Sequence, residues 1–146
     1  MADEFDIEAS GLLDGLDGTA RAERAELISW LLADGITVDQ IAPGQATARM
    51  LVRDTMLNGH NICHGGYIFL LADTAFAFAC NTYGPVTVAA ACDIAFLAPA
   101  HLDDELIATA TERHHAGRSG IYDVTVRRPD TTVIAEFRGH SRTLRT

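Results

Sequence analysis

Residues 64–81 have the sequence HGGYIFLLADTAFAFACN, and Asp73 is the single charged side chain between Gly65 and Cys92. Apolar residues fall on nearly every side of a helix drawn through this stretch, which predicts a buried helix from about Gly66 to Asn81. An unpaired carboxylate in such a helix carries a large desolvation cost, so it is paired, protonated or used in chemistry. Asp73 is therefore a candidate catalytic residue, with a purely structural bond to an arginine or to backbone amides as the alternative.

His64, Gly65 and Gly66 stand at the start of this helix. The first amides of a helix have no partners within it and lie at the positive end of its dipole. Because glycine lets a carbonyl oxygen approach these amides closely, the segment is a candidate oxyanion site. The His-Gly-Gly pattern alone is a weak indication, and its weight comes from the combination with Asp73.

The spacing of Gly65 and Asp73 predicts an assembly. On one helix these two positions lie about 12 Å apart along the axis, so they cannot easily reach one carbonyl group. If both act on one substrate, Asp73 must come from a neighbouring subunit's antiparallel helix across a two-fold axis. The sequence therefore predicts a homodimer with shared active sites.

Strand patterns follow the helix, and turn residues separate them at Pro99, Ala116-Gly117 and Pro129-Asp130. The predicted strands are Val86–Leu97, Glu105–His114, Gly120–Arg127 and Thr132–Arg142. Ahead of the helix, the pattern predicts an amphipathic helix at Ala20–Ala33, an ambiguous segment at Ile36–Ile41 and a strand at Ala46–Val52. The fold class is α+β, with a largely antiparallel sheet wrapped around one long central helix.

The chain has 146 residues, a hydrophobic fraction of 48% and a net charge of −9, which suits a folded domain rather than a disordered chain. Most of the excess negative charge falls in residues 1–45. Residues 1–20 are expected to form a mobile leader. The predicted division is an acidic leader with its amphipathic helix at 1–34, and a main domain at 35–146.

Several classes of function are excluded or disfavoured by composition. The chain has no lysine, which excludes Schiff-base chemistry, pyridoxal phosphate attachment and a lysine-dependent phosphate loop. No basic stripe favours nucleic acid. The apolar run at 62–80 is interrupted by polar residues and glycines, and the N-terminus is acidic, so we expect a cytoplasmic protein without a membrane span.

The three cysteines Cys63, Cys80 and Cys92 lack metal-binding spacing and are expected to be small buried hydrophobes. Cys63 with His60 and His64 is the alternative metal site, but the flanking glycines argue against the helix that would align the histidines. We therefore expect no metal. A Cys63–His64 nucleophilic pair is disfavoured because adjacent side chains rarely reach each other.

The chain resembles the hotdog thioesterases of phenylacetate degradation, the hydroxyphenylacetyl-CoA thioesterase family. The resemblance covers about residues 35–146 and rests on LNGHNICHGG at 57–66, LADTAFA at 71–77, ACN at 79–81, ACDIAFLAP at 91–99, GIYD at 120–123 and EFRG at 136–139. It implies a hotdog fold and a dimer with a shared sheet, commonly paired again into a homotetramer. An aspartate on the central helix matches this branch better than the related enzymes with glutamate there.

The resemblance also implies roles for individual residues. The Gly65 amide would polarise a thioester carbonyl, and Asp73 of the partner subunit would be the nucleophile or the general base. Asn58 would orient water or the acyl group, and His64 would support the site. Two alternatives stay open, because Asn58 precedes a glycine and can be a turn residue, and His64 can be a helix-start residue without a catalytic role.

Substrate binding is assigned to Gly66, Arg118, Ser119 and Gly120. Arginine suits phosphate geometry, so Arg118 is a candidate for the phosphates of coenzyme A, with a merely solvated loop arginine as the alternative. Coenzyme A belongs to the substrate, and no separate cofactor is expected. Residues 3–41 resemble instead the N-terminal regulatory segment of actinobacterial adenylate cyclases.

The predicted function is hydrolysis of phenylacetyl-CoA-like thioesters, aryl or medium-chain, to the free acid and coenzyme A. A non-catalytic acyl-CoA-binding sensor is the alternative from another class, with the leader as its signalling part. A hotdog dehydratase that uses His64 and Asp73 is the second enzymatic alternative. The sequence does not identify the acyl group. It also does not decide whether Asp73 acts as the nucleophile or as the general base.

Overall fold

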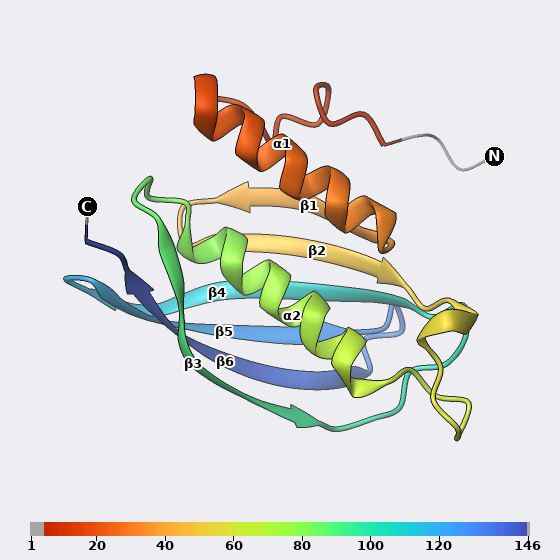
Figure 1. Cartoon of the computed structure of the whole chain (residues 1–146). Coiled ribbons are helices and arrows are strands. Elements are labelled where there is room, and N and C mark those ends of the chain that lie inside the picture. Colours follow the sequence, from red (N-terminus) through yellow and green to blue (C-terminus); the bar gives the residue numbers. More distant parts are fainter. Residues whose placement is uncertain (1–4, 146) are drawn as a thin grey trace.

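The computed structural model describes residues 5–145 and contains one antiparallel sheet and two α-helices (Figure 1). The elements are α1 (Gly18–Ala33), β1 (Ile36–Ala42), β2 (Gln45–Leu51), a short 3-10 helix (Asp54–Met56), α2 (Gly65–Cys80), β3 (Thr87–Phe96), β4 (Glu105–Ala116), β5 (Ser119–Arg127) and β6 (Val133–Thr143). The strand order is β1-β2-β4-β5-β6-β3, and every neighbouring pair is antiparallel. The predicted α+β class and the sheet around a central helix are confirmed.

The ambiguous segment after α1 is the strand β1. Its alternate side chains Ile36 and Val38 are buried, which is the two-residue period of a strand with one face on the core. Gly35, with a φ of 80°, ends α1 at the predicted position.

One side of the central helix α2 packs into the core. Leu71, Ala72 and Ala75 are buried, whereas Asp73 and Ala77 on another side of the helix are only half-buried. Figure 1 shows α2 lying across the face of the curved sheet. The Asp73 side of α2 is therefore the side left accessible in the single chain.

Gly139 of β6 brings the sheet backbone close to α2. A Cβ atom at this position would lie 2.7 to 2.8 Å from ring carbons of Phe76, closer than real Cβ atoms approach their neighbours. The Phe76 ring is itself held by Tyr122 and Phe137, at centroid distances of 5.6 and 5.7 Å. A side chain at position 139 would have to displace a ring in the middle of the core.

We expect Gly139→Ala to lower the free energy of unfolding by about 1 to 3 kcal/mol, the usual cost of overpacking a core. Urea unfolding of the variant and the wild type measures this. Gly59→Ala is the matched control, because a Cβ atom at Gly59 would meet nothing within 4 Å. Phe76→Leu combined with Gly139→Ala should recover part of the loss, and equal stability of the two glycine variants would contradict the packing argument.

The leader differs from the expectation of a mobile segment. Residues 1–4 lie outside the described part, but Leu12 and Leu13 are buried. Two arginines of α1 bind the backbone of these residues. Arg21 donates a hydrogen bond to the Leu13 carbonyl and Arg24 donates one to the Leu12 carbonyl, each at 3.0 Å. The expected mobility of residues 5–17 is therefore wrong, because the helix holds the leader by its backbone.

The apolar side of α1 is narrower than the sequence predicts. Ile28 and Leu31 are buried, but Leu27 is 43% exposed and Trp30 is 56% exposed. The helix packs against β1 at one edge of the sheet, so only a narrow stripe of its surface is covered (Figure 1).

The strand β3 forms the other edge of the sheet and pairs only with β6. Although its sequence is TVAAACDIAF, nearly all its side chains are exposed. A largely apolar strand with a free edge is a template for pairing with another strand. In the part of the chain that the structure describes, no helix is long and apolar enough to cross a membrane.

Candidate active site

The N-terminus of α2 has one free amide in a defined place. His64 is the N-cap, with extended backbone angles of φ −60° and ψ 133°, and its Nδ1 accepts a hydrogen bond from the Gly66 N–H at 2.9 Å. The Gly65 N–H has no hydrogen-bond partner within residues 5–145. Of these two amides, it is Gly65 that can donate to a substrate, while Gly66 is occupied by the cap.

Phe96, at the end of β3, covers this amide on one side. A Cβ atom on Gly65 would lie 3.0 Å from Cζ of the Phe96 ring, which is itself 52% exposed. The ring thus makes an apolar wall beside the free N–H. Sequence reasoning did not single out Phe96 as a site residue, because its proximity to Gly65 depends on a contact between distant segments.

Asn58 organises the loop that precedes α2. Its Oδ1 accepts from the His60 N–H at 2.8 Å and from the Ile62 N–H at 3.4 Å. Its own backbone N–H donates to the Ile62 carbonyl at 2.9 Å. The turn role that the sequence allowed is therefore present, and it directs the oxygen of the side chain into the loop. The Nδ2 group makes no hydrogen bond within the described chain and can still donate to a ligand.

Asp73 is half-buried and has no hydrogen bond or ion pair among the described residues. The alternative, a structural bond to an arginine or to backbone amides, is not seen within the described residues. Burial raises the pKa of the Asp73 carboxyl, because desolvation disfavours the charged form. A carboxylate kept accessible, unpaired and poised above its ordinary pKa suits acid–base or nucleophilic chemistry.

Two cysteines lie within the electrostatic reach of Asp73. Burial and then the Asp73 charge raise the pKa of Cys80 to about 11, and the same two causes raise that of Cys92. The expectation of buried cysteines is confirmed for Cys63 and Cys80 but is wrong for Cys92, which is exposed on β3. Asp73 therefore lies close enough to Cys92 on β3 for its charge to act on that thiol. No cluster of three or more potential ligands for a metal ion occurs in residues 5–145.

Gly65 and Asp73 do not converge within one chain. Both belong to α2, where their positions differ by about 12 Å along the axis. Asn58, His64 and Gly65 therefore form one half of a candidate site at the start of the helix. Asp73 forms the other half, further along the same helix.

The residues assigned to substrate binding are separated from this helix start. Arg118 lies in the turn before β5, and its carbonyl accepts a hydrogen bond from the Thr143 N–H. The next residue, Leu144, donates its N–H to the carbonyl of Val86, just ahead of β3. Asn81, at the end of α2, bonds to Thr87 in the same region. Arg118 thus belongs to the C-terminal end of α2, and the structure does not bring it to Gly65 of the same chain.

Within this group Arg118 has a buried donor without a partner. Its Nη1 atom is buried and has no hydrogen-bond partner in the described chain. The Ser119 hydroxyl already accepts from Arg142 at 2.9 Å, and Gly120 is buried so tightly that a Cβ atom would lie 2.7 Å from the Ser141 hydroxyl. Ser119 and Gly120 therefore make contacts within the chain, and their assignment to substrate binding stays a prediction.

Residues 60–135 match the Thioesterase superfamily. A curated protein of Escherichia coli K12, the acyl-coenzyme A thioesterase PaaI, is 47% identical over 73% of this chain and 76% of its own length. The chain belongs to the thioesterase superfamily. This membership makes it a thioester hydrolase, and the predicted hotdog fold and enzyme class are confirmed.

Solved structures support the same assignment for this thioesterase. The E. coli PaaI protein of the phenylacetic acid degradation operon has a TM-score of 0.81 and 42% identity, covering 85% of this chain and 90% of that one. The TT0310 protein of Thermus thermophilus has a TM-score of 0.76 and 35% identity, covering 80% and 97%.

The N-terminal part of this thioesterase has a second relationship. Residues 5–64 match the adenylate cyclase regulatory domain. A pH-sensitive adenylate cyclase of Mycobacterium tuberculosis is 58% identical over 40 residues, which are 27% of this chain and 10% of that protein. The resemblance predicted for the leader is confirmed, and it extends through β1 and β2 to the start of α2.

Proposed function

We propose that the protein hydrolyses acyl-CoA thioesters of the phenylacetyl or medium-chain type, with Asp73 as its catalytic carboxylate and the Gly65 amide as its oxyanion donor. One observation carries the proposal, namely the unpaired, half-buried Asp73 on the same helix as the free Gly65 N–H. The name of the E. coli relative, an acyl-coenzyme A thioesterase, supports coenzyme A as the leaving group.

The active unit is a homodimer in which each site takes residues from both subunits. The separation of Gly65 and Asp73 along α2 requires a second chain if both groups act on one carbonyl. The exposed edge of β3 supplies a surface for this partner, because two copies of β3 paired antiparallel would continue the sheet. Pairing of two such dimers into a homotetramer is part of the same proposal.

The reaction follows from these positions. The thioester oxygen accepts a hydrogen bond from Gly65, while Asp73 of the other subunit, in its ionised form, takes a proton from water. The water oxygen bonds to the carbonyl carbon, the carbon–sulfur bond breaks, and the thiolate of coenzyme A takes up the proton that Asp73 removed from water. If Asp73 attacks directly, it forms a mixed anhydride that water then hydrolyses.

The loop residues have supporting roles in this proposal. Asn58 orients the water or the acyl group through Nδ2, the part of its side chain that the loop leaves free. His64 holds the first turn of α2 by accepting from Gly66, which keeps the Gly65 amide directed outward. Phe96 shields that amide from water on one side, which strengthens an electrostatic contact there.

Release of free thiol from phenylacetyl-CoA and from a series of straight-chain acyl-CoAs tests the proposal. We expect coenzyme A and the free acid in equal amounts. Tight binding without any change of the thioester would favour the acyl-CoA sensor instead. A new double bond in a 3-hydroxyacyl-CoA without thiol release would favour the dehydratase.

Arg118 is proposed to bind the phosphates of coenzyme A, because its buried Nη1 has no other partner in the described chain. We expect Arg118→Ala to raise KM for acyl-CoA about tenfold, the loss of one charge-assisted hydrogen bond, with little change in kcat. The KM for the matching acyl-pantetheine, which lacks the nucleotide, should stay the same. Arg127→Ala is the control, since Arg127 is an exposed arginine at the far end of β5, the strand that follows Arg118. Equal effects on both substrates would contradict phosphate binding.

A further inference from the structure

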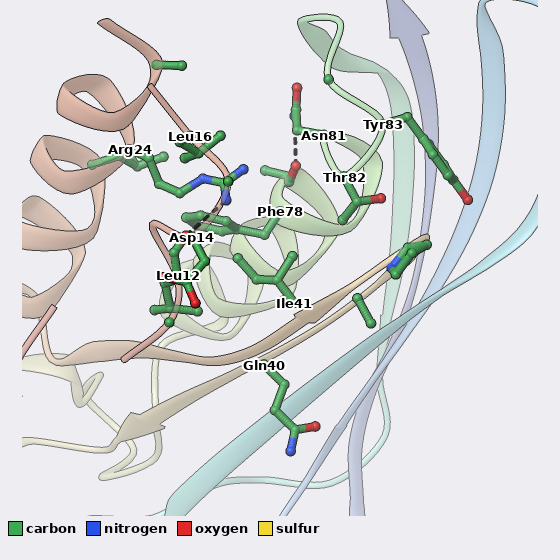
Figure 2. A pocket seen from close by; sticks show the side chains of 18 of the residues that line it. Leu12, Asp14, Leu16, Arg24, Gln40, Ile41, Phe78, Asn81, Thr82 and Tyr83 are labelled. Atoms are coloured by element: carbon green, nitrogen blue, oxygen red, sulfur yellow. Dashed lines mark hydrogen bonds between the residues drawn. The ribbon is translucent and has the colours of Figure 1, made fainter. Parts of the chain in front are cut away.

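A large cavity lies between the leader and the end of the central helix. Its volume is about 1140 Å³, and its walls come from residues 10–16, α1, the end of β1, the last turns of α2 and the segment 82–87. Figure 2 shows the side chains of Leu16, Ile41 and Phe78 gathered in the space between α1 and α2. The cavity does not include Gly65 or Asp73.

The cavity begins one helical turn beyond Asp73. Ala77 lines it, and residues four apart lie on the same side of a helix, here about 6 Å apart along the axis. Val86 and Thr87 also line it and lead into β3, the strand whose Cys92 is within reach of the Asp73 charge. A chain attached to a carbonyl at Asp73 can therefore pass along α2 into this space.

The charges around the cavity indicate an uncharged occupant. Three carboxylates, from Asp14, Glu23 and Asp39, line it against the single lining guanidinium of Arg24, and Asp39 is paired with Arg49. The Arg24 guanidinium is already hydrogen-bonded to the leader, because its Nη1 donates to the Leu12 carbonyl. This balance disfavours a phosphate or a free carboxylate, whereas Leu12, Leu16, Leu27 and Phe78 offer apolar contacts to a hydrocarbon chain.

We propose that this cavity receives the distal part of the acyl chain, so that the leader and α1 set the preferred chain length of the thioesterase. The inference rests on the proposed function and refines its substrate class toward straight acyl chains longer than a phenylacetyl group. The segment related to adenylate cyclase regulatory domains thereby becomes a wall of the substrate site.

The test compares kcat/KM for butyryl-, phenylacetyl-, octanoyl- and decanoyl-CoA in the full chain. A fully buried methylene changes an association constant about fourfold, so with partial burial we expect decanoyl-CoA to exceed butyryl-CoA by at least about tenfold. Leu27→Asp places a charge on the cavity wall and should remove most of this preference while leaving butyryl-CoA within about twofold.

Trp30→Asp is the matched control, because Trp30 is an exposed apolar residue of the same helix that does not line the cavity. It should leave the chain-length profile unchanged. A wild-type rate that does not rise with chain length, or equal effects of the two variants, would overturn the inference while hydrolysis of butyryl-CoA still supported the proposed function. No hydrolysis of any substrate would instead refute the proposed function.

Discussion

Replacing Asp73 by asparagine is expected to lower kcat for thioester hydrolysis by about a hundredfold to ten-thousandfold, the usual contribution of a positioned acid–base group. Asparagine keeps the size of the side chain but can neither accept a proton from water nor attack the carbonyl. The rate of thiol release from phenylacetyl-CoA measures the loss. Because Asp73 acts in its ionised form, wild-type activity should also rise with pH through a pKa above that of an ordinary carboxyl.

The same substitution should not damage the fold. Burial raises the pKa of Asp73, so the folded chain keeps this proton to a higher pH than the unfolded chain does. The stability that depends on this group is therefore lost as pH rises through that window, because ionisation of a half-buried carboxyl opposes folding. Asp73→Asn removes this cost and should unfold at the same or a higher temperature than wild type at neutral pH.

Together these two results distinguish a catalytic Asp73 from a structural one. A catalytic residue can be destabilising and still be retained, since function rather than packing requires it. Equal rates in the variant and the wild type would remove Asp73 from the chemistry. A variant that lost activity because it unfolded would show that the carboxylate has a structural partner after all.

The second large effect is expected at β3. A glutamate in place of Ala91, in the middle of the exposed edge strand, would put two like charges close together if two β3 strands pair. We expect Ala91→Glu to shift the protein toward monomers and to lower activity about a hundredfold at dilute protein concentration, because each site needs both subunits. Sedimentation and thiol release on the same samples measure both changes.

Thr109→Glu is the control for this charge. Thr109 is exposed on β4, an inner strand that is paired on both sides, so a glutamate there does not meet a new strand. This variant should keep the wild-type assembly state and activity. A fully active monomer of Ala91→Glu would contradict the shared site, even if Asp73 proved essential.

The central helix and the positions of the strands along the chain could be predicted because they follow from local patterns, whereas the order of the strands within the sheet was not predicted. The apolar run around Asp73 and the turn residues between the strands are each visible within a short window of sequence. The start of α2 was predicted within one residue for the same reason, since glycines after a capping histidine mark a helix N-terminus.

The remaining features depend on contacts between distant segments. Phe96 lies 31 positions after Gly65 in the numbering of the chain, and only the folded sheet brings its ring to that amide. Leu12 and Leu13 carry no periodic pattern, and their burial comes from α1 holding the backbone of the leader. Similarly, Trp30 has the spacing of a buried residue but lies outside the narrow contact with β1.

The division at residues 34 and 35 stays a prediction. The match to adenylate cyclase regulatory domains spans residues 5–64 and crosses it, while the thioesterase match begins at residue 60. In the structure, α1 packs on β1, the first strand beyond that division.

The shared active site can be tested most directly by mixing two inactive variants. Gly65→Pro deletes the oxyanion N–H at the first helical residue, where proline suits the backbone because His64 before it is extended. Its Cβ atom requires a small shift of the Phe96 ring, which is exposed on one side. Asp73→Asn deletes the carboxylate. In a dimer that contains one chain of each kind, one of the two sites would have both groups intact.

Co-expression of the two variants should therefore restore about one quarter of the wild-type thiol release, since about half of the dimers are mixed and each has one working site. Each variant expressed alone should stay nearly inactive. If the mixture is as inactive as its components, Gly65 and Asp73 of the same chain serve one site, and the account of a dimer-borne thioesterase site is wrong.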